Sequence, residues 1–551
     1  MAPASPGIGR GARECLAQQV LDAGMNRAKS TELDAALATM SAEALREVVH
    51  ELLSELDDRA SARVVGSLMA RAARNGSGWA PAAVSEEQVA EVQAFVKAAQ
   101  RVGQADPSEV DDYLRRGSAA FLRMDYSAAY PIFVALLPPI GDAEIDLGQR
   151  ELVDEVLGAD VAECAAQCVV SAYMLAPVEE RARDVLAAIE AVRGVAHFWE
   201  PLREMERVAV EPLRDLKDFL PQWRTLIANT PAGKRTGDRD TEADRWLREV
   251  VQRLEGTAGL AKVARSTRRA DDLRAWCNSL VDAGDWRAAL SAFEESAEIA
   301  TDRDYMRGEL LDGAALAAQT LELDDLAAHL ERAWRADPSL SRLRRWLGSS
   351  SSKVTLGKRV AEALEVCPKE AAAQRVLLHL LSHEFGPAAT LVASAPGLGW
   401  SSGEHPGHTA FLLLARLLGG LRTNPIERAD IASERETQPE VLDAMSASSE
   451  KPRIVTPEVD ALLALAGVDR ISDAASRTLV LAALKKAAES RVAGVTDQKR
   501  RRHYRHAAEL VATCVACDDS SATVRWVAAL RAEYRRFPAL REELDRAMGA
   551  S

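Results

Sequence analysis

Apolar residues recur every three or four positions along most of the chain, with polar and charged residues between them. Residues 45–56, LREVVHELLSEL, and residues 243–256, ADRWLREVVQRLEG, show this spacing clearly. Such spacing places the apolar side chains on one face of an α-helix. Strict alternation of β-branched or aromatic residues with polar ones, which would indicate strands, is nearly absent. The pattern therefore predicts an all-α protein built from amphipathic helices.

Stretches rich in Gly, Pro, Ser and charged residues interrupt the helical pattern. We expect the main breaks at residues 74–83, 229–241, 348–353, 394–408 and 422–458. The stretch at 229–241 is polar and rich in Gly and Pro, which indicates a linker. The stretch at 422–458 is long and rich in proline, which indicates an irregular segment within the C-terminal part of the chain.

These breaks predict three helical regions, at residues 1–228, 241–394 and 409–551. Local signals also predict helix ends. Ser41 and the pair Asp106-Pro107 are typical of helix starts, and Gly158 is typical of a helix stop.

The most informative stretch is residues 274–302, RAWCNSLVDAGDWRAALSAFEESAEIATD. Two short helices are expected to meet at Gly284-Asp285. Ala289 and Phe293 then follow at helical spacing on the second helix. A small residue lets two helices approach closely, and a large one fills the groove against the next helix.

This unit resembles a tetratricopeptide repeat, in which a Gly-Asp-aromatic turn is followed by a small Ala and then a bulky residue. Residues 115–140 are similar, with Gly117 on the first helix and Ala129 and Phe133 on the second. Residues 313–339 are also similar, although Leu326 stands where a small Ala is expected. The resemblance implies helical hairpins stacked as an α-solenoid, with less regular helical regions at the two ends of the chain.

Composition narrows the class of protein further. The 551 residues are 47% hydrophobic and 28% charged, which is typical of a globular protein. A net charge of −14 disfavours general binding to the phosphate backbone of nucleic acids. The 7 cysteines are scattered, which favours a reducing compartment over a disulfide framework. The N-terminus lacks the apolar core of a signal peptide, and residues 409–421 are too short to span a bilayer.

We therefore expect a cytoplasmic protein. Its preference for Ala and for Arg over Lys is typical of a GC-rich bacterial genome.

Histidines gather between residues 379 and 408 and raise the question of a metal site. His379 and His383 stand four residues apart and share a helix face, as zinc ligands can. His405 and His408 follow in the next loop. A zincin pattern would need a third histidine at position 387, where Pro387 stands instead. A metalloprotease is therefore not predicted, and a structural metal site stays an open alternative.

A second pattern of this kind is RRHYRHAAELVATCVAC at residues 501–517, with His503, His506, Cys514 and Cys517. The stretch contains no Gly or Pro, so one continuous helix is expected. The two pairs stand three turns apart, about 16 Å along the axis, which is too far for both to bind one zinc ion. We expect a helix that docks through its cysteine end.

Two other motifs do not support a catalytic function. Residues 231–238, PAGKRTGD, lack the Ser or Thr that follows the lysine of a P-loop, because Arg235 follows Lys234. Residues 141–153 place acidic residues at alternate positions, but Val153 stands where an EF-hand needs its last Glu. We assign no catalytic residue, cofactor or bound metal.

The sequence therefore favours a non-catalytic scaffold that binds a partner protein or peptide through a helical-repeat surface. The first helices of the hairpins are expected to carry this surface, at Arg274, Asn278, Asp282, Asp312 and Gln319.

Two alternatives stay open beside the scaffold. One is a nucleic-acid-associated accessory protein that uses the basic runs at 262–274, 341–348 and 497–506. The other is a metal-binding protein or a metal or cysteine enzyme, for which the 379–408 histidines are the metal candidates.

Overall fold

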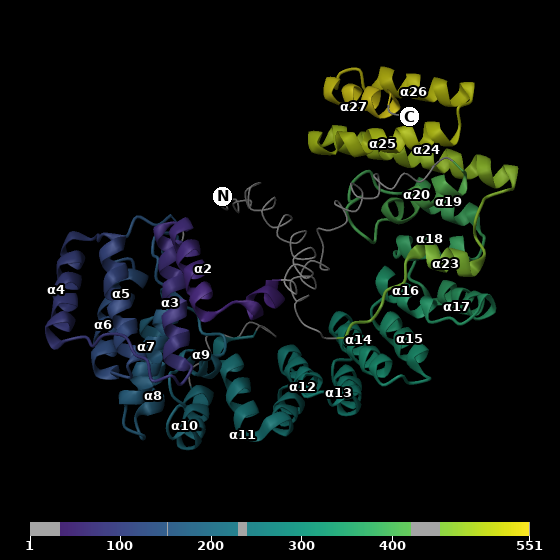
Figure 1. Cartoon of the computed structure of the whole chain (residues 1–551). Helices are drawn as coiled ribbons and strands as arrows, with labels where there is room; N and C mark the ends of the chain where they lie inside the picture. Colours follow the sequence, from purple (N-terminus) through teal and green to yellow (C-terminus); the bar gives the residue numbers. More distant parts are fainter. Residues whose placement is uncertain (1–32, 151, 230–239, 420–451, 550–551) are drawn as a thin grey trace. The chain divides into compact units, whose positions relative to one another are not determined.

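The computed structural model describes residues 33–150, 152–229, 240–419 and 452–549. Within these ranges the chain forms helices, one isolated parallel bridge between Gln104 and Asp146, and no β-strand (Figure 1). The prediction of an all-α protein is confirmed. The P-loop-like residues 231–238 and most of the linker predicted at 229–241 lie outside the described residues.

The chain divides into two compact units, Met1–Gly256 and Thr257–Ser551. The division falls inside helix α11 (Glu242–Thr267), where Gly256 has φ 62° and ψ −154°. This left-handed backbone is tolerated by glycine because it has no Cβ, and it interrupts the helix. The three regions expected from the sequence stay a prediction.

The first unit is a succession of helices that begin and end at local signals. Ser41 accepts a hydrogen bond at the start of α2, and Asp106 with Pro107 starts α5, as predicted. Gly158 follows only a short 3-10 turn, Val153–Glu155, rather than an α-helix. The helices before α11 are α2 (Ala42–Glu55), α3 (Asp58–Arg74), α4 (Glu86–Val102), α5 (Pro107–Leu122), α6 (Tyr126–Gly141), α7 (Val161–Leu175), α8 (Arg181–Ala191), α9 (Pro201–Val208) and α10 (Leu216–Asn229).

The repeat-like residues 115–140 form the α5–α6 hairpin of this unit. Ala129 and Phe133 are fully buried. A Cβ on Gly117 would come within 2.8 Å of the Phe133 ring, so the glycine lets α5 and α6 approach closely. Phe133 thus packs on Gly117 of its own hairpin, and the resemblance to a repeat stays a prediction.

The second unit contains the other two repeat-like stretches. Residues 274–302 form α12 and α13, which meet at Gly284-Asp285, and Asp285 accepts a hydrogen bond from the backbone of Ala288. The helices are α12 (Ala270–Asp282), α13 (Trp286–Ile299), α14 (Asp304–Thr320), α15 (Leu326–Ala336), α16 (Leu340–Gly348), α17 (Lys353–Val366), α18 (Ala372–Leu381), α19 (Phe385–Ala393), α20 (Pro406–Leu417), α23 (Val459–Ala466), α24 (Ala474–Asp497), α25 (Tyr504–Cys517), α26 (Ser521–Glu533) and α27 (Pro538–Gly549).

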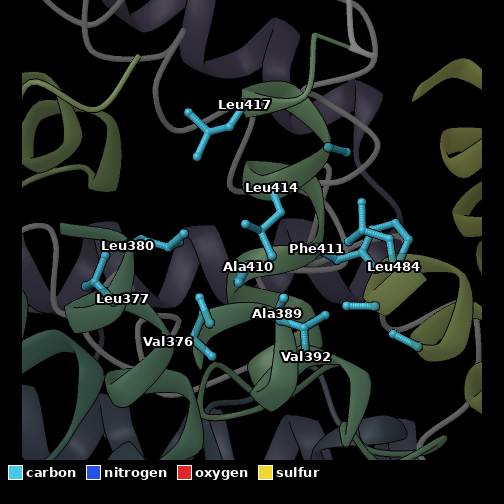
Figure 2. Close-up of a cluster of buried hydrophobic side chains, with 14 of the residues drawn as sticks. Val376, Leu377, Leu380, Ala389, Val392, Ala410, Phe411, Leu414, Leu417 and Leu484 are labelled. Atoms are coloured by element: carbon cyan, nitrogen blue, oxygen red, sulfur yellow. The ribbon is translucent and has the colours of Figure 1, made fainter. Parts of the chain in front are cut away.

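Consecutive helices from α12 to α20 pack against each other, α23 packs on α16, α17 and α18, and α24 packs on α19 and α20. Figure 2 shows part of the resulting core, with Val376 and Leu377 of α18, Val392 of α19, Phe411 of α20 and Leu484 of α24. The core thus joins helices that are far apart in the sequence.

Candidate binding surface

The first helices of three successive hairpins in the second unit are joined by ion pairs. Arg274 of α12 makes a two-pronged pair with Glu309 of α14, at 2.7 Å from Nε and 2.6 Å from Nη2. Arg342 of α16 donates from Nε to Asp312 of α14 at 2.7 Å. Two-pronged pairs fix orientation as well as distance. These ion pairs link α12 to α14 and α14 to α16.

Two of the five residues predicted to form the binding surface take part in these ion pairs. Arg274 pairs with Glu309, and Asp312 pairs with Arg342. Both residues therefore connect helices of this chain. Burial raises the pKa of Asp312, although Arg342 and Arg345 oppose this shift. Asn278 and Asp282 are exposed on α12. The fifth predicted residue, Gln319, has a different role.

Gln319 contacts a segment of the chain that follows it by 134 positions. Its Nε2 donates to the main-chain carbonyl of Arg453 at 3.0 Å. Arg453 belongs to residues 452–458, which contain no helix and lead directly into α23, as the yellow-green trace in Figure 1 shows. This stretch, Pro452–Glu458, is called the docked segment below. It is the part of the predicted irregular segment 422–458 that the structure describes, and it is non-helical as predicted.

Two neighbouring arginines of α16 hold the other end of the docked segment. Arg344 donates from Nε and Nη2 to the carbonyl oxygen of Pro457, at 2.9 and 2.6 Å. Arg345 donates from Nε to the Thr456 hydroxyl at 2.8 Å. Glu458 lies 3.7 Å from the Arg344 guanidinium. Arg344 and Arg345 therefore contact both the main chain and the polar side chains of the segment.

Pro457 lies in a notch at the end of α16. A Cβ on Gly348 would come within 2.3 Å of the Pro457 ring, so the absence of a side chain at 348 makes the notch. Ile454 packs against the core of the second unit, whereas Val455 is 77% exposed. The alternation of Ile454, Val455 and Thr456 is typical of an extended segment with one face on a surface.

Sequence reasoning missed Arg344, Arg345 and Gly348 as binding residues. The sequence placed the arginines only in a basic run, and Gly348 only at a break. The sequence does contain a local pattern just before α23. Ile454 is apolar, Thr456 carries a hydroxyl two positions later, and Pro457 follows directly. Nothing in that pattern says which helices receive the segment.

The histidines of 379–408 point to different partners. His379 pairs with Glu384 at 2.7 Å, His383 contacts the carbonyl of Ala466 at 3.2 Å, and His405 caps α20. In the described part of the chain, no group of three or more His, Cys, Asp or Glu side chains is arranged to hold a metal ion. The structure therefore does not support the metal-binding alternative.

The stretch 501–517 is a short 3-10 turn followed by α25, which begins at Tyr504. Cys514 is buried, and His506 lies edge-on to the ring of Trp400 with ring centres 5.6 Å apart. Burial raises the pKa of Cys514 and of Cys517. A nucleophilic thiol needs the opposite shift, so the arrangement is that of core residues.

The basic runs differ in what they contact. Arg265 pairs with Glu295, and the arginines of 341–348 bind Asp312 and the docked segment. In contrast, Arg500, Arg501 and Arg502 are exposed at the turn between α24 and α25, and none of them forms an ion pair within the described ranges. The third run therefore presents these three arginines to solvent, whereas Arg505 of the same run pairs with Glu509.

The first unit contains an open hollow of about 560 Å³ between the end of α4 and the start of α5. Phe95 and Val102 form its apolar wall, and Asp106 and Asp146 lie at its rim. Asp106 accepts hydrogen bonds from Ser108, and Asp146 accepts one from the backbone of Gly148. These carboxylates serve helix and turn geometry rather than acid–base chemistry.

None of the helices in the described ranges has both the length and the apolar content needed to cross a bilayer. The chain matches no model of a known protein family, and a search of curated proteins finds no match. The geometry of the chain itself is therefore the basis for a functional proposal.

Proposed function

We propose that this protein is a non-catalytic scaffold that binds a partner protein through the first helices of the hairpins in its second unit. One observation carries the proposal. The docked segment, which contains no helix, lies against α14 and α16 and is held by Gln319, Arg344 and Arg345. These helices therefore have the chemistry to hold an extended polypeptide.

Physical reasons support this use of the surface. Arginine and glutamine side chains that donate to main-chain carbonyls accept many sequences, since every residue offers a carbonyl. The ion pair of Arg345 with Asp312 of α14 orients one of the donors in advance, which lowers the entropy lost on binding. Stacking of the hairpins as a tetratricopeptide-like solenoid is part of the proposal, supported by the Gly284-Asp285 turn and the buried Ala289 and Phe293.

Site-specific photo-crosslinking in cells of the source species tests the scaffold. A photo-reactive amino acid placed at exposed Asn278 or Thr320 on the first helices should capture the same protein. The matched position is exposed Ser291 on α13, a second helix, which should not capture it. Equal capture from all three positions, or no capture from the first two, would contradict the proposal.

Nucleic-acid binding is the second candidate, favoured by the exposed Arg500, Arg501 and Arg502. Exposed Arg535 and Arg536 lie in the turn between α26 and α27 and add to the charge of the C-terminal helices. Fluorescence anisotropy with a labelled single-stranded oligonucleotide at low salt tests this function. Binding that weakens with salt and disappears when the three arginines are neutralised would support it. An unchanged anisotropy at low salt would exclude it.

A further inference from the structure

The docked segment is attached to the second unit by few buried atoms. All of Pro452–Glu458 is exposed or half-exposed, and Val455 is 77% exposed. The chain is anchored instead by the next helix, α23, whose Leu462 and Leu463 are only 2% exposed. Ile454 is the residue of the segment that packs against the core, and it is only partly buried, so release of the segment removes few core contacts.

One of the receiving side chains keeps a charged partner when the segment leaves. Arg345 also lies 3.5 Å from Asp312. The end of α16 is held by Arg359, which donates to the carbonyl of Trp346 and to the Ser349 hydroxyl. The Gly348 notch is a feature of the helix backbone. Arg345 and the notch are therefore supported by contacts that do not involve the segment.

The contacts define the chemistry of a ligand. Two carbonyl oxygens accept from Gln319 and Arg344, so the ligand is an extended main chain. Arg345 selects a hydroxyl side chain, the notch at Gly348 selects a proline directly after it, and Arg344 favours an acidic residue after the proline. The pattern is an apolar residue, one free position, Ser or Thr, Pro, and Asp or Glu.

We propose that the docked segment is an internal ligand of this site, and that a partner protein binds by placing an extended segment of the same pattern there and displacing it. This inference rests on the proposed scaffold function. It adds the class of partner segment that binds and the competition by which the docked segment limits that binding. A tethered occupant is present at high effective concentration, so it lowers the apparent affinity for any competing segment. Binding therefore depends on the fraction of molecules whose site is open.

A direct binding measurement tests the inference on the full chain. The probe is a fluorescein-labelled synthetic peptide, PRIVTPEV, which reproduces residues 452–459. The protein variant replaces residues 452–458 with an equally long run of Gly and Ser. Fluorescence anisotropy should show the peptide binding this variant at least about tenfold more tightly than the unaltered protein.

Two controls identify the site. Adding Arg344→Ala and Arg345→Ala to the Gly/Ser variant should abolish binding of the peptide, and a peptide of scrambled sequence should not bind. A second protein variant keeps the native segment but carries Thr456→Ala, Pro457→Ala and Glu458→Ala, which remove its own contacts. It should bind the peptide more tightly than the unaltered protein. If the Gly/Ser variant does not fold, this variant takes its place in the measurement.

The inference is overturned if the peptide fails to bind a variant that keeps its circular dichroism and melting temperature, or binds it no better than the unaltered protein. Capture of one partner through Asn278 and Thr320 without peptide binding would leave the scaffold function standing and exclude this site. Peptide binding without any captured partner would support the site and contradict the scaffold.

Discussion

The ring of Phe293 in α13 lies directly against Gly313 in α14, the first helix of the next hairpin. A Cβ on Gly313 would come within 2.3 Å of the ring carbon Cε1. Phe293 is nearly buried, at 8% exposed. This contact is where two successive hairpins of the second unit meet, and it leaves no room for one more methyl group.

Gly313→Ala should therefore destabilise the second unit, by about 1–3 kcal/mol, because the ring or the helix must shift. Where space is free, replacing Gly by Ala stabilises a helix by about 1 kcal/mol. A loss of stability in Gly313→Ala would therefore point to the steric contact. Urea unfolding followed by circular dichroism measures the change. Gly357→Ala on α17 is the matched control, because a Cβ there meets nothing within 4 Å, and it should not destabilise. Equal effects of the two substitutions would contradict the close contact.

Gly348→Ala should release the docked segment without unfolding α16. The new Cβ would come within 2.3 Å of Pro457, and the backbone at 348 is not left-handed, so alanine suits the helix. Limited trypsin digestion with mass spectrometry should show faster cleavage after Arg453 than in the unaltered protein. The same rate of cleavage at Arg453 would show that Pro457 does not depend on the notch.

Arg342→Ala should be strongly destabilising. Arg342 is buried and pairs with half-buried Asp312 and Asp337, so its removal deprives Asp337 of this partner and leaves Asp312 with Arg345. Breaking a fully buried pair costs about 3–5 kcal/mol, which is the upper limit here. Arg332→Ala removes an exposed pair with Glu294 and should cost less than about 1 kcal/mol. Thermal unfolding of both variants checks the difference, and a mild effect of Arg342→Ala would argue against the buried network.

His506 should make the second unit less stable in acid. Burial lowers the pKa of His506 to about 4, and Arg491, His408, His503 and His405 add to the shift. Because the folded pKa lies below the unfolded value of about 6.5, stability is present above that pH and is lost as pH falls toward 4. The loss is at most about 3 kcal/mol.

The comparison for this histidine is His506→Phe, which keeps an aromatic ring beside Trp400. Urea unfolding at several pH values between 7 and 4 should show a smaller acid loss in this variant. Exposed His50→Gln is the control and should follow the unaltered protein. A parallel acid loss in His506→Phe would exclude this cause.

Glu249 should make the first unit less stable as pH rises, the opposite of the pH dependence expected from His506. Its carboxylate accepts backbone hydrogen bonds from Leu202 and Arg203 at the start of α9, at 3.2 and 2.8 Å. Burial raises the pKa of Glu249 to about 7, although these two bonds oppose the shift. The folded pKa lies above the unfolded one, so the contribution is present below about pH 4.3 and is lost as pH rises through 7.

Glu249→Gln should therefore gain stability relative to the unaltered protein as pH rises from 5 to 8. Chemical unfolding of both proteins across this range measures the difference. Glu47→Gln, at an exposed position on α2, is the control and should show little change. A difference that stays constant with pH would rule out the titration of Glu249.

The sequence by itself determined the features that depend on neighbouring residues. The helices follow from apolar spacing, and the starts at Ser41 and Asp106-Pro107 and the turn at Gly284-Asp285 follow from side chains that satisfy nearby backbone groups. Ala129 and Phe133 are buried on α6, as apolar residues at helical spacing are expected to be.

Only the tertiary structure decided which distant groups meet. Gln319 and Arg453 are 134 positions apart, and the sequence offered no reason to join them. Arg274 and Asp312 were expected on a free surface, but the approach of α12, α14 and α16 brings opposite charges to each of them. Hydrogen bonds and ion pairs act over a few ångströms, so their partners are chosen by how the helices pack rather than by the pattern along the chain.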